Sequence, residues 1–298
     1  MFNIHKINLT TGIKSSLYFK EFIFPAGEVS VKLNAADYAY QSIEQPNVIV
    51  ARIQNSDDLF KLANLKDALE RFDKNPINLF MPYLPYARQD RVCDRGESFS
   101  LKVFANYINS LNFNKVTIVD PHSLVSEAVI DRVQIISQLD VLNKYTDFIP
   151  TLMGSVLVSP DAGSNKKTAE VAGWLAHDNF VRADKLRDLT NGKIKEIAVY
   201  CDDLKGRNVV IVDDICEMGG TFIGLAAELK KKNCGKVILY VTHGVFGGDT
   251  NLTTTLEKLL CNGIDQIWTT DSYYHDLVDT QHPNIHVLGL VNKFFDKL

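Results

Sequence analysis

The sequence predicts an α/β fold in which mostly parallel sheets are flanked by helices. Short runs of Val, Ile and Leu alternate along the chain with segments whose apolar residues recur at helical spacing. Continuous apolar runs are typical of parallel strands, because helices cover both faces of such a sheet. The 298 residues contain enough of these runs for two sheets. We therefore expect two domains, 1–145 and 146–298.

In the first half, apolar runs predict strands at 47–53, 77–83 and 115–120, with helices at 57–72 and 98–111. The helix at 57–72 places Leu62, Leu65, Leu69 and Phe72 on one face. Asp57 or Asp58 is its expected N-cap, since a carboxylate there can accept a free backbone N–H.

The second half repeats this alternation. Strands are predicted at 155–161, 196–201, 208–214, 236–244, 265–271 and 285–290, and helices at 165–176 and 221–233. The strand segments "KVTIVDPH" and "KVILYVTHG", one in each half, both begin with Lys-Val and have a His at or next to their ends. We interpret the two halves as similar, duplicated domains.

Composition narrows the class of protein. Hydrophobic residues make up 46% and charged residues 23%, and the formal net charge is −4. These values are typical of a globular protein and do not indicate a nucleic-acid or membrane partner. The five cysteines contain no CxxC pair, and no apolar stretch reaches 18 residues. We expect no disulfide framework, signal peptide or transmembrane helix, and a cytoplasmic location.

The stretch "VVIVDDICEMGGTF" (209–222) carries the clearest chemical signal. A buried strand ends on Asp213 and Asp214, and Gly219 and Gly220 then lead into a helix near Thr221. Backbone N–H groups in such a turn bind an anion. The two carboxylates would repel that anion, so they suit the vicinal hydroxyls of a sugar instead. The stretch therefore predicts a sugar-phosphate site.

Polar residues also follow other predicted strands. Asp120 and His122 follow one strand of the first half, and Asp161 and His243 follow strands of the second. In open α/β sheets, ligands bind at the carboxyl ends of the strands. These residues are therefore candidates for substrate or metal binding.

The loop at 213–221 resembles the phosphoribosyl-binding loop of type I phosphoribosyltransferases and of ribose-phosphate pyrophosphokinases. Five further segments are similar to motifs of the second family: "FIFPAGEV" (22–29), "YLPYARQDRVCDR" (83–95), "VDPHS" (119–123), "SPDAGSNKK" (159–167) and "VTHGVF" (241–246). The Ala-Arg-Gln-Asp segment favours the pyrophosphokinases over ordinary transferases. The resemblance implies two similar type I phosphoribosyltransferase-like domains, the first binding ATP and the second holding the ribose-phosphate loop and a catalytic lid.

The resemblance also implies a reaction. The family transfers the β,γ-diphosphoryl group of ATP to the anomeric hydroxyl of ribose 5-phosphate, with AMP as the leaving product and Mg²⁺ as cofactor. Such chemistry needs positioning and charge neutralisation more than covalent catalysis. The resemblance further implies a homo-oligomer, a dimer or a hexamer.

In the first domain, the matched motifs assign the ATP contacts. Phe24 and Glu28 would contact adenine across a subunit interface, and Arg88, Gln89 and Asp94 would hold ATP. Arg88 suits a bidentate phosphate contact. Ala26 stands where the family has a polar residue.

For the metal and diphosphate, the motifs implicate His122 and Asp161. Both would position Mg²⁺, directly or through water, and the loop Asp161, Ala162, Gly163 and Ser164 would cradle the diphosphate. Lys185 and Arg187 match the family's catalytic Lys-x-Arg. They lie in the polar segment "RADKLRDLTNGK" (182–193), which we expect to be a lid.

For the acceptor, the motif assigns Asp213, Asp214, Glu217, Met218, Gly219, Gly220 and Thr221 to ribose-phosphate binding. Glu217 replaces the family's third Asp, Met218 replaces a Thr, and Ser164 stands where a second Gly is usual. Met218 removes a hydroxyl donor expected to face the 5-phosphate. These departures from the family motif therefore lie mainly among the residues assigned to the acceptor, and less among those assigned to ATP.

Three alternatives follow. The same reaction could take a larger ribose-phosphate ester such as ADP-ribose, whose 5-position carries a diester and needs fewer donors. The chain could be a non-catalytic subunit that binds catalytic partners, although Arg88, Asp161, Lys185 and Arg187 argue against this. A nucleobase phosphoribosyltransferase is a third class, but it needs no ATP segment.

Overall fold

The computed structural model describes residues 1–7, 14–34, 46–72, 74–177, 180–187, 194–247, 252–274 and 282–294. The chain forms two compact units, Met1–Ile136 with Leu290–Leu298 and Ser137–Gly289. We expected a division at 145, whereas the structure assigns the segment from Ser137 to the second unit and helix α10 (Leu290–Lys293) to the first.

The first unit contains a mixed sheet. Its strand order is β2 (Lys14–Leu17), β1 (Phe2–Ile7), β5 (Asn47–Ala51), β6 (Ile77–Met81), β7 (Lys115–Val119) and β8 (Val133–Ile136). Strands β5 to β8 are parallel, while β1 is antiparallel to both β2 and β5. All five residues of β5 and of β6 are buried, as expected for parallel strands with both faces covered.

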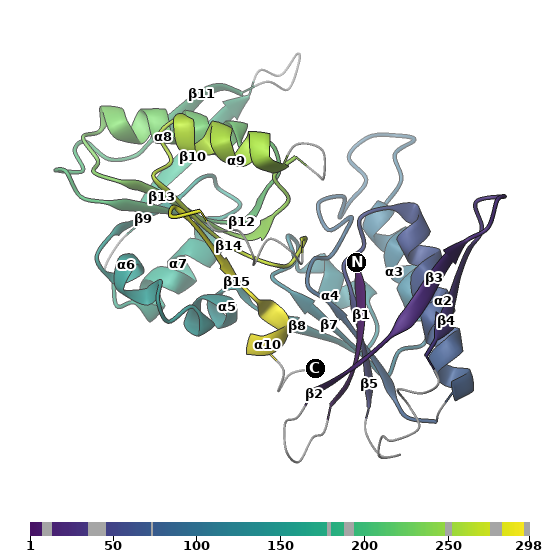
Figure 1. Ribbon diagram of the computed structural model, residues 1–298. Coiled ribbons are helices and arrows are strands. Elements are labelled where there is room, and N and C mark those ends of the chain that lie inside the picture. Colours follow the sequence, from purple (N-terminus) through teal and green to yellow (C-terminus); the bar gives the residue numbers. More distant parts are fainter. Residues whose placement is uncertain are drawn as a thin grey trace. The chain divides into compact units, whose positions relative to one another are not determined.

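The same unit contains three helices in addition to this sheet: α2 (Ser56–Phe72), α3 (Ser100–Ser110) and α4 (Val125–Val129). A separate hairpin, β3 (Phe19–Ile23) and β4 (Val29–Leu33), lies beside α2 (Figure 1). Leu62, Leu65 and Leu69 of α2 are fully buried in the core of this unit, as their spacing predicts.

The expected N-cap of α2 is wrong by two or three residues. The side chain of Asn55, not Asp57 or Asp58, accepts the backbone N–H of Asp58 at 3.1 Å. The Asp58 carboxylate instead accepts the N–H of Gln54 at 2.9 Å. Asn55 thus accepts the N–H of Asp58, and Asp58 accepts the N–H of the residue before Asn55. This arrangement is similar to a capping box.

The second unit is built on a longer sheet. Its strand order is β11 (Ile194–Val199), β10 (Val181–Arg187), β9 (Val156–Ser159), β12 (Val209–Cys216), β13 (Val237–Gly244), β14 (Gln266–Thr270) and β15 (Ile285–Leu288). Only the β10–β11 pair is antiparallel within this described sheet. The expected α/β class with mostly parallel sheets is therefore confirmed in both units.

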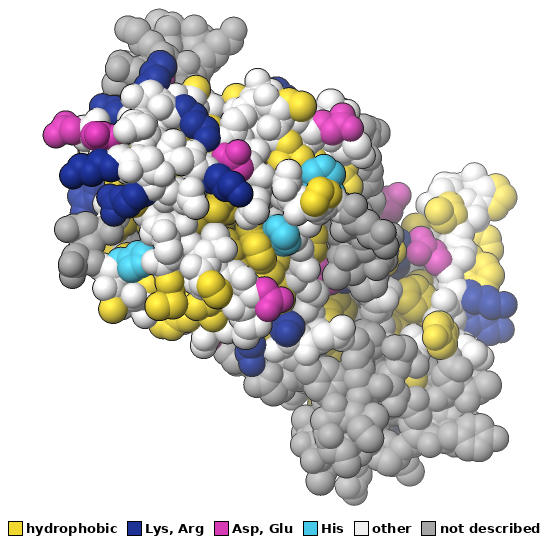
Figure 2. All heavy atoms as spheres, turned by 60° about the vertical axis from the view of Figure 1, so that its left-hand side comes forward, with side chains coloured by type: hydrophobic (Ala, Val, Ile, Leu, Met, Phe, Trp, Pro, Cys, Tyr) yellow, Lys and Arg dark blue, Asp and Glu magenta, His cyan; other side chains and the backbone are white. Residues whose placement is uncertain are grey.

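Helices cover both faces of the second sheet. Figure 1 shows α8 (Gly220–Lys231) and α9 (Leu252–Cys261) on one side, and α5 (Gln138–Lys144), α6 (Ile149–Met153) and α7 (Asn165–Trp174) on the other. On the face of this unit that Figure 2 presents, several Lys and Arg side chains gather on one side, and hydrophobic side chains lie in groups elsewhere. None of the described helices is long and apolar enough to cross a membrane.

Most of the expected strands and helices are present, with ends shifted by a few residues. The segments that we did not expect are β1 to β4, α4, β8, α5, α6, β10, α9 and α10. The segment 182–193, expected to be a lid, begins as a strand, because β10 extends to Arg187 and pairs with both β9 and β11. Residues 188–193 lie outside the described part of the chain.

Candidate active site

Four side chains meet at the carboxyl edge of the second sheet. Asp161 and Ser164 follow β9, Asp213 ends the apolar part of β12, and Lys185 lies on β10. The Lys185 Nζ donates to Asp161 Oδ2 at 2.8 Å, and the Ser164 hydroxyl is 2.8 Å from Asp213 Oδ1 and 3.1 Å from Asp161 Oδ1. The predicted diphosphate loop, catalytic lysine and ribose carboxylate are thus joined in one hydrogen-bonded group.

The parallel order of the sheet brings these residues together. Strand β9 lies between β10 and β12, so residues more than twenty positions apart in sequence end at the same edge. The loop after β9 is closed locally, because the N–H of Ser164 donates to Asp161 Oδ1 at 3.0 Å. Ser164 is also buried. Its hydroxyl therefore has a role that the family's usual Gly could not supply.

The carboxylates of this group differ in their electrostatics. Burial raises the pKa of Asp161, but the hydrogen bond and charge of Lys185 more than offset this, so the pKa lies below its ordinary value. The pKa of Asp213 is raised well above its ordinary value by burial and by the charge of Asp214. Asp213 is thus held beside another carboxylate at an energetic cost, which is typical of a ligand-binding site.

The neighbouring carboxylate, Asp214, is buried and faces a cation that we did not predict. The Lys167 Nζ on α7 lies 3.8 Å from Asp214 Oδ2. Gln138, also missed, donates to the backbone carbonyl of Asp213 at 2.9 Å. Lys167 lies one helical turn after Ser164, so helical spacing from the diphosphate loop could have suggested it.

The glycine turn after β12 has the geometry expected for an anion site. Gly219 has a φ of 71°, a left-handed conformation that favours glycine, and a Cβ there would lie 2.8 Å from Leu259 Cδ2. Helix α8 begins at Gly220, where a Cβ would meet open space. The helix therefore starts beside open space, and the first turn of an α-helix carries backbone N–H groups that have no partner within the helix.

Two of the departures from the family pattern, Glu217 and Met218, lie on the surface of this turn. Glu217 is exposed, and Met218 is 56% exposed. Thr221 is partly exposed in the first turn of α8. The exposed side chain of Met218 can therefore be reached by a ligand.

In the first unit, the segment predicted to bind ATP forms an exposed loop between β6 and α3. Arg88 and Gln89 line a cavity of about 500 Å³ together with Asp90, Arg91, Cys93, Glu97 and Ser98. The predicted residue Asp94 is exposed in the same loop, outside this lining. Sequence reasoning missed Glu97, whose carboxylate accepts the N–H groups of Cys93 and Asp94 at 2.9 and 3.1 Å and so shapes the loop.

Asp90 connects this loop with the predicted metal residue His122. The Asp90 carboxylate accepts two hydrogen bonds from Arg91, at 2.7 and 3.0 Å. These bonds, with further contributions from Ser123 and His122, lower the pKa of Asp90 to about 2. His122 itself is exposed directly after β7.

Phe24 and Glu28 lie in the tip of the β3–β4 hairpin. The N–H of Phe24 donates to the Glu28 carbonyl at 2.9 Å, and the Phe24 side chain is 53% exposed. The turn is completed by Gly27, whose φ is 85°. The hairpin therefore presents both predicted adenine contacts to the outside of this unit.

A metal site made by protein alone is absent from the described residues, where no group of three or more His, Cys, Asp or Glu side chains could hold an ion. This fits Mg²⁺, which takes one or two carboxylates and completes its shell with water and substrate phosphates. Asp161, partly exposed beside the diphosphate loop, has the chemistry of such a ligand.

A parallel α/β unit with paired carboxylates and a glycine turn at its carboxyl edge defines the class of the phosphoribosyltransferase-type proteins. Residues 168–276 match the model of the phosphoribosyl transferase domain, and residues 6–111 match that of the N-terminal domain of ribose phosphate pyrophosphokinase.

Curated relatives agree with these matches. The chain is 29% identical over 281 residues to the ribose-phosphate pyrophosphokinase of Campylobacter jejuni, covering 91% of this chain and 83% of the relative. It is 30% identical over 243 residues to that of Hyphomonas neptunium, covering 79% and 73%. The chain belongs to the ribose-phosphate pyrophosphokinase family, which confirms the expected enzyme class and supports phosphoribosyl pyrophosphate synthesis as its general activity.

A solved structure supports the fold across both units. The phosphoribosylpyrophosphate synthetase of Mycobacterium smegmatis aligns with a TM-score of 0.76 at 21% identity, covering 95% of this chain and 89% of that one. The expectation of two phosphoribosyltransferase-like domains agrees with this likeness.

Proposed function

We propose that this enzyme transfers the diphosphoryl group of ATP to the anomeric hydroxyl of ribose 5-phosphate, releasing AMP, in the presence of Mg²⁺. The observation that carries the proposal is the group formed by Asp161, Ser164, Lys185 and Asp213. It places the residues matched to the diphosphate, the catalytic cation and the ribose hydroxyls within direct contact of one another.

In this mechanism, Lys185 neutralises charge on the diphosphoryl group as it moves between its two oxygen partners. In the structure the ammonium is held by Asp161, and its side chain is only 14% exposed. A cation that is already positioned in a partly buried site stabilises developing negative charge more strongly than one in water. A bound magnesium ion would add charge neutralisation and align the phosphates.

Asp213 and Asp214 would accept hydrogen bonds from the vicinal hydroxyls of the ribose, while the start of α8 would bind its 5-phosphate. Ser164 orients Asp213, and Lys167 balances the charge of Asp214. Two neighbouring carboxylates next to a phosphate would otherwise repel it. The arrangement separates the hydroxyl-binding and phosphate-binding ends of the acceptor.

The exposed Met218 favours a second candidate acceptor. A larger ribose-phosphate ester such as ADP-ribose would retain the ribose hydroxyls and place its second substituent beyond the turn. The 56% exposed Met218 offers an apolar contact there and lacks the hydroxyl that a phosphate monoester would use.

One assay separates these acceptors. Purified enzyme is mixed with ATP, Mg²⁺ and a panel of ribose 5-phosphate esters, and AMP is followed by chromatography. AMP formation with ribose 5-phosphate supports the first acceptor, and preferential formation with ADP-ribose supports the second. No AMP with any ester would contradict the proposed reaction.

A double substitution tests further which of the two acceptors the enzyme uses. Glu217→Asp with Met218→Thr restores a hydroxyl donor near the 5-phosphate, and a hydrogen bond to a charged group contributes about 1.5–3 kcal/mol. We expect kcat/KM for ribose 5-phosphate to rise relative to ADP-ribose by about 10-fold or more. If the wild type uses only ribose 5-phosphate and the variant does not improve, the larger-acceptor hypothesis is wrong.

We also propose that the enzyme is a cytoplasmic homo-oligomer. The hairpin exposes Phe22, Ile23 and Phe24 by 43%, 68% and 53%, and a second copy would bury these side chains. The five cysteines are all free, in line with a reducing compartment. Sedimentation of wild type and of Ile23→Lys would test the oligomeric state, with a smaller assembly expected for the variant.

A further inference from the structure

The proposed catalytic cation, Lys185, lies on a part of β10 that the parallel strands do not hold. Strand β10 pairs with β9 only at Val181 and Arg182. From Ala183 to Arg187, its partner in the described sheet is β11, which is the edge strand of that sheet. The backbone position of Lys185 therefore depends on how β11 is attached to the rest of the unit.

Helix α8 holds β11 by a close contact between a glycine and an isoleucine. Ile197 of β11 lies directly opposite Lys185, so the two side chains point to the same face of the sheet. Strand β11 contacts α8, and Ile197 is partly buried against the core of this unit. A Cβ added to Gly224 of α8 would lie only 2.8 Å from Ile197 Cδ1. The end of the Ile197 side chain thus occupies the place of the side chain that Gly224 lacks, and we call this the Ile197–Gly224 contact.

The glycine at position 224 is not explained by the helix itself. Gly224 lies inside α8, and its φ is not in the left-handed region. Glycine in a helix interior is less favourable than alanine, because its unfolded backbone is more flexible. The close approach of β11 is therefore the physical reason that the structure offers for a residue without a side chain.

The same helix carries the acceptor end of the proposed reaction site. Helix α8 starts at Gly220, directly after the glycine turn, and Gly224 follows one helical turn later. Through α8 and β11, the place of Lys185 is thereby linked to the glycine turn. We propose that Ile197 and Gly224 are positioning residues, which fix Lys185 relative to the turn that receives the acceptor phosphate. This inference rests on the proposed function, in which Lys185 is the catalytic cation.

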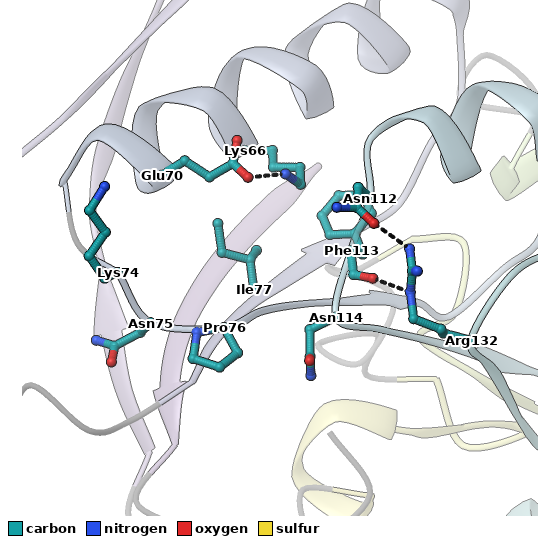
Figure 3. Close-up of a pocket in the computed structure, with 10 residues that line it drawn as sticks. All are labelled: Lys66, Glu70, Lys74, Asn75, Pro76, Ile77, Asn112, Phe113, Asn114 and Arg132. Atoms are coloured by element: carbon teal, nitrogen blue, oxygen red, sulfur yellow. Dashed lines mark hydrogen bonds and ion pairs between the residues drawn. The ribbon is translucent and has the colours of Figure 1, made fainter.

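The edge strand of the first unit is attached in a different way. Arg132, the residue before β8, donates from Nε to the Phe113 carbonyl at 2.7 Å and from Nη2 to Asn112 Oδ1 at 2.9 Å (Figure 3). Hydrogen bonds hold that edge, whereas a van der Waals contact holds β11, and such a contact depends on the volume of both residues. A change of one carbon atom at residue 197 or 224 is therefore a sensitive test.

Gly224→Ala is the first test. The added methyl group meets Ile197 Cδ1, so either the Ile197 side chain turns or β11 moves away from α8. We expect kcat to fall about 5-fold or more, because a displacement of about 1 Å in a catalytic group can cost about 100-fold. KM for ATP and for the acceptor should change less than kcat, because the residues that contact the substrates remain. The melting temperature should not fall, because alanine is the better helix former.

A second substitution should restore activity. Ile197→Val removes Cδ1 and keeps Cγ1, which lies 4.0 Å from the Cβ position of residue 224, an ordinary contact distance. Gly224→Ala combined with Ile197→Val should therefore regain kcat to within about 2-fold of wild type, a non-additive result expected for residues in contact. Gly173→Ala is the control, because Gly173 lies in α7 and a Cβ there would meet no atom within 4 Å. Its kcat should equal that of the wild type.

Amide hydrogen exchange of the ligand-free protein gives a readout that does not depend on the reaction. In Gly224→Ala, N–H groups of the β10–β11 pair should exchange about 10-fold faster, because this pair opens more readily, while those of β8 and β12 stay as in the wild type. A normal kcat for Lys185→Ala would contradict the proposed function and leave this expected exchange unchanged. The two hypotheses can therefore fail separately.

Three results would overturn the inference. Gly224→Ala could keep the wild-type kcat, Ile197→Val could fail to restore the lost kcat, or Gly173→Ala could lose as much kcat as Gly224→Ala. In the first case, faster exchange would show that the contact holds β11 without positioning Lys185. A loss of kcat in Gly224→Ala that Ile197→Val restores supports the inference.

Discussion

The two units present their predicted substrate residues in contrasting ways. In the second unit, Asp161, Ser164, Lys185 and Asp213 are bonded to one another before any ligand is present. In the first unit, Arg88 is exposed on a loop, and the backbone of that loop is shaped by Glu97.

This difference follows from how each site is constructed. The ATP loop of the first unit is one continuous stretch of sequence between β6 and α3. The site of the second unit is instead built from residues on or after three neighbouring parallel strands, β10, β9 and β12. A preorganised charged site reduces the reorganisation needed during the reaction. The exposed side chain of Arg88 instead loses its conformational freedom when it contacts a bound nucleotide. We therefore expect substitutions in the second unit to lower kcat and those in the ATP loop to raise KM.

The largest expected effect is that of Lys185→Ala. Removing a positioned cation from the transition state lowers kcat by about 100- to 1,000-fold, as for other electrostatic contacts of this kind. ATP affinity should stay within several-fold, because the loop of the first unit is intact. Initial rates and nucleotide binding are measured for this variant and for Lys166→Ala, an exposed neighbour on α7. A near-normal kcat for Lys185→Ala would rule out its catalytic assignment.

Arg88→Ala should show the opposite kinetic pattern. Loss of a charged contact to phosphate, at about 1.5–3 kcal/mol, raises KM for ATP by about 10- to 150-fold with a smaller change in kcat. Arg95→Ala, an equally exposed residue outside the cavity lining, is the matched control. If both variants have the same KM for ATP, Arg88 does not bind the nucleotide.

The glycine turn offers a matched pair of substitutions. Gly219→Ala forces a left-handed backbone on alanine and brings its Cβ to 2.8 Å from Leu259, whereas Gly220→Ala meets open space within the helix. The strain is on the order of 1–3 kcal/mol, so KM for the acceptor should rise about 5- to 150-fold in the first variant. Gly220→Ala should bind the acceptor within a few-fold of wild type. Equal acceptor KM values for the two variants would contradict the assigned turn geometry.

The smallest effect concerns stability and tests the strain in the second unit. The pKa of Asp213 is raised from 3.8 to about 8, so the folded state binds the proton more tightly than the unfolded state. Its contribution to stability is therefore greatest below pH 4 and is lost as the pH rises towards 8. Asp213→Asn should stabilise the ligand-free protein by at least about 1 kcal/mol at pH 8.5, the equivalent of one pKa unit, and by a clearly smaller amount at pH 5.

Thermal unfolding at the two pH values measures this effect. Asp203→Asn is the control of opposite sign, because backbone N–H and Asn233 contacts lower the pKa of that exposed carboxylate. Stabilisation by Asp213→Asn at pH 5 as large as at pH 8.5 would show that ionisation of this carboxylate carries no cost.

The sequence alone determined the α/β class, the central strands and the motifs of the site. Strands such as β5 and β6 are buried on both faces, so their apolar runs are continuous and easily recognised. The glycine turn was also predictable, because Gly219 adopts a conformation that few other residues tolerate. The N-terminal strands β1 to β4 were missed, since their mixed polar sequence lacks such a run.

Only the tertiary structure decided which of these residues meet. The hydrogen bond between Lys185 and Asp161, the link from Ser164 to Asp213 and the approach of Lys167 to Asp214 all join separate segments. Strand order creates these contacts, and β9 lies between β10 and β12 although β10 precedes β12 in the chain. A local pattern can mark the residues at the end of a strand, but the sheet determines their neighbours, because its hydrogen bonds join segments that are distant in sequence.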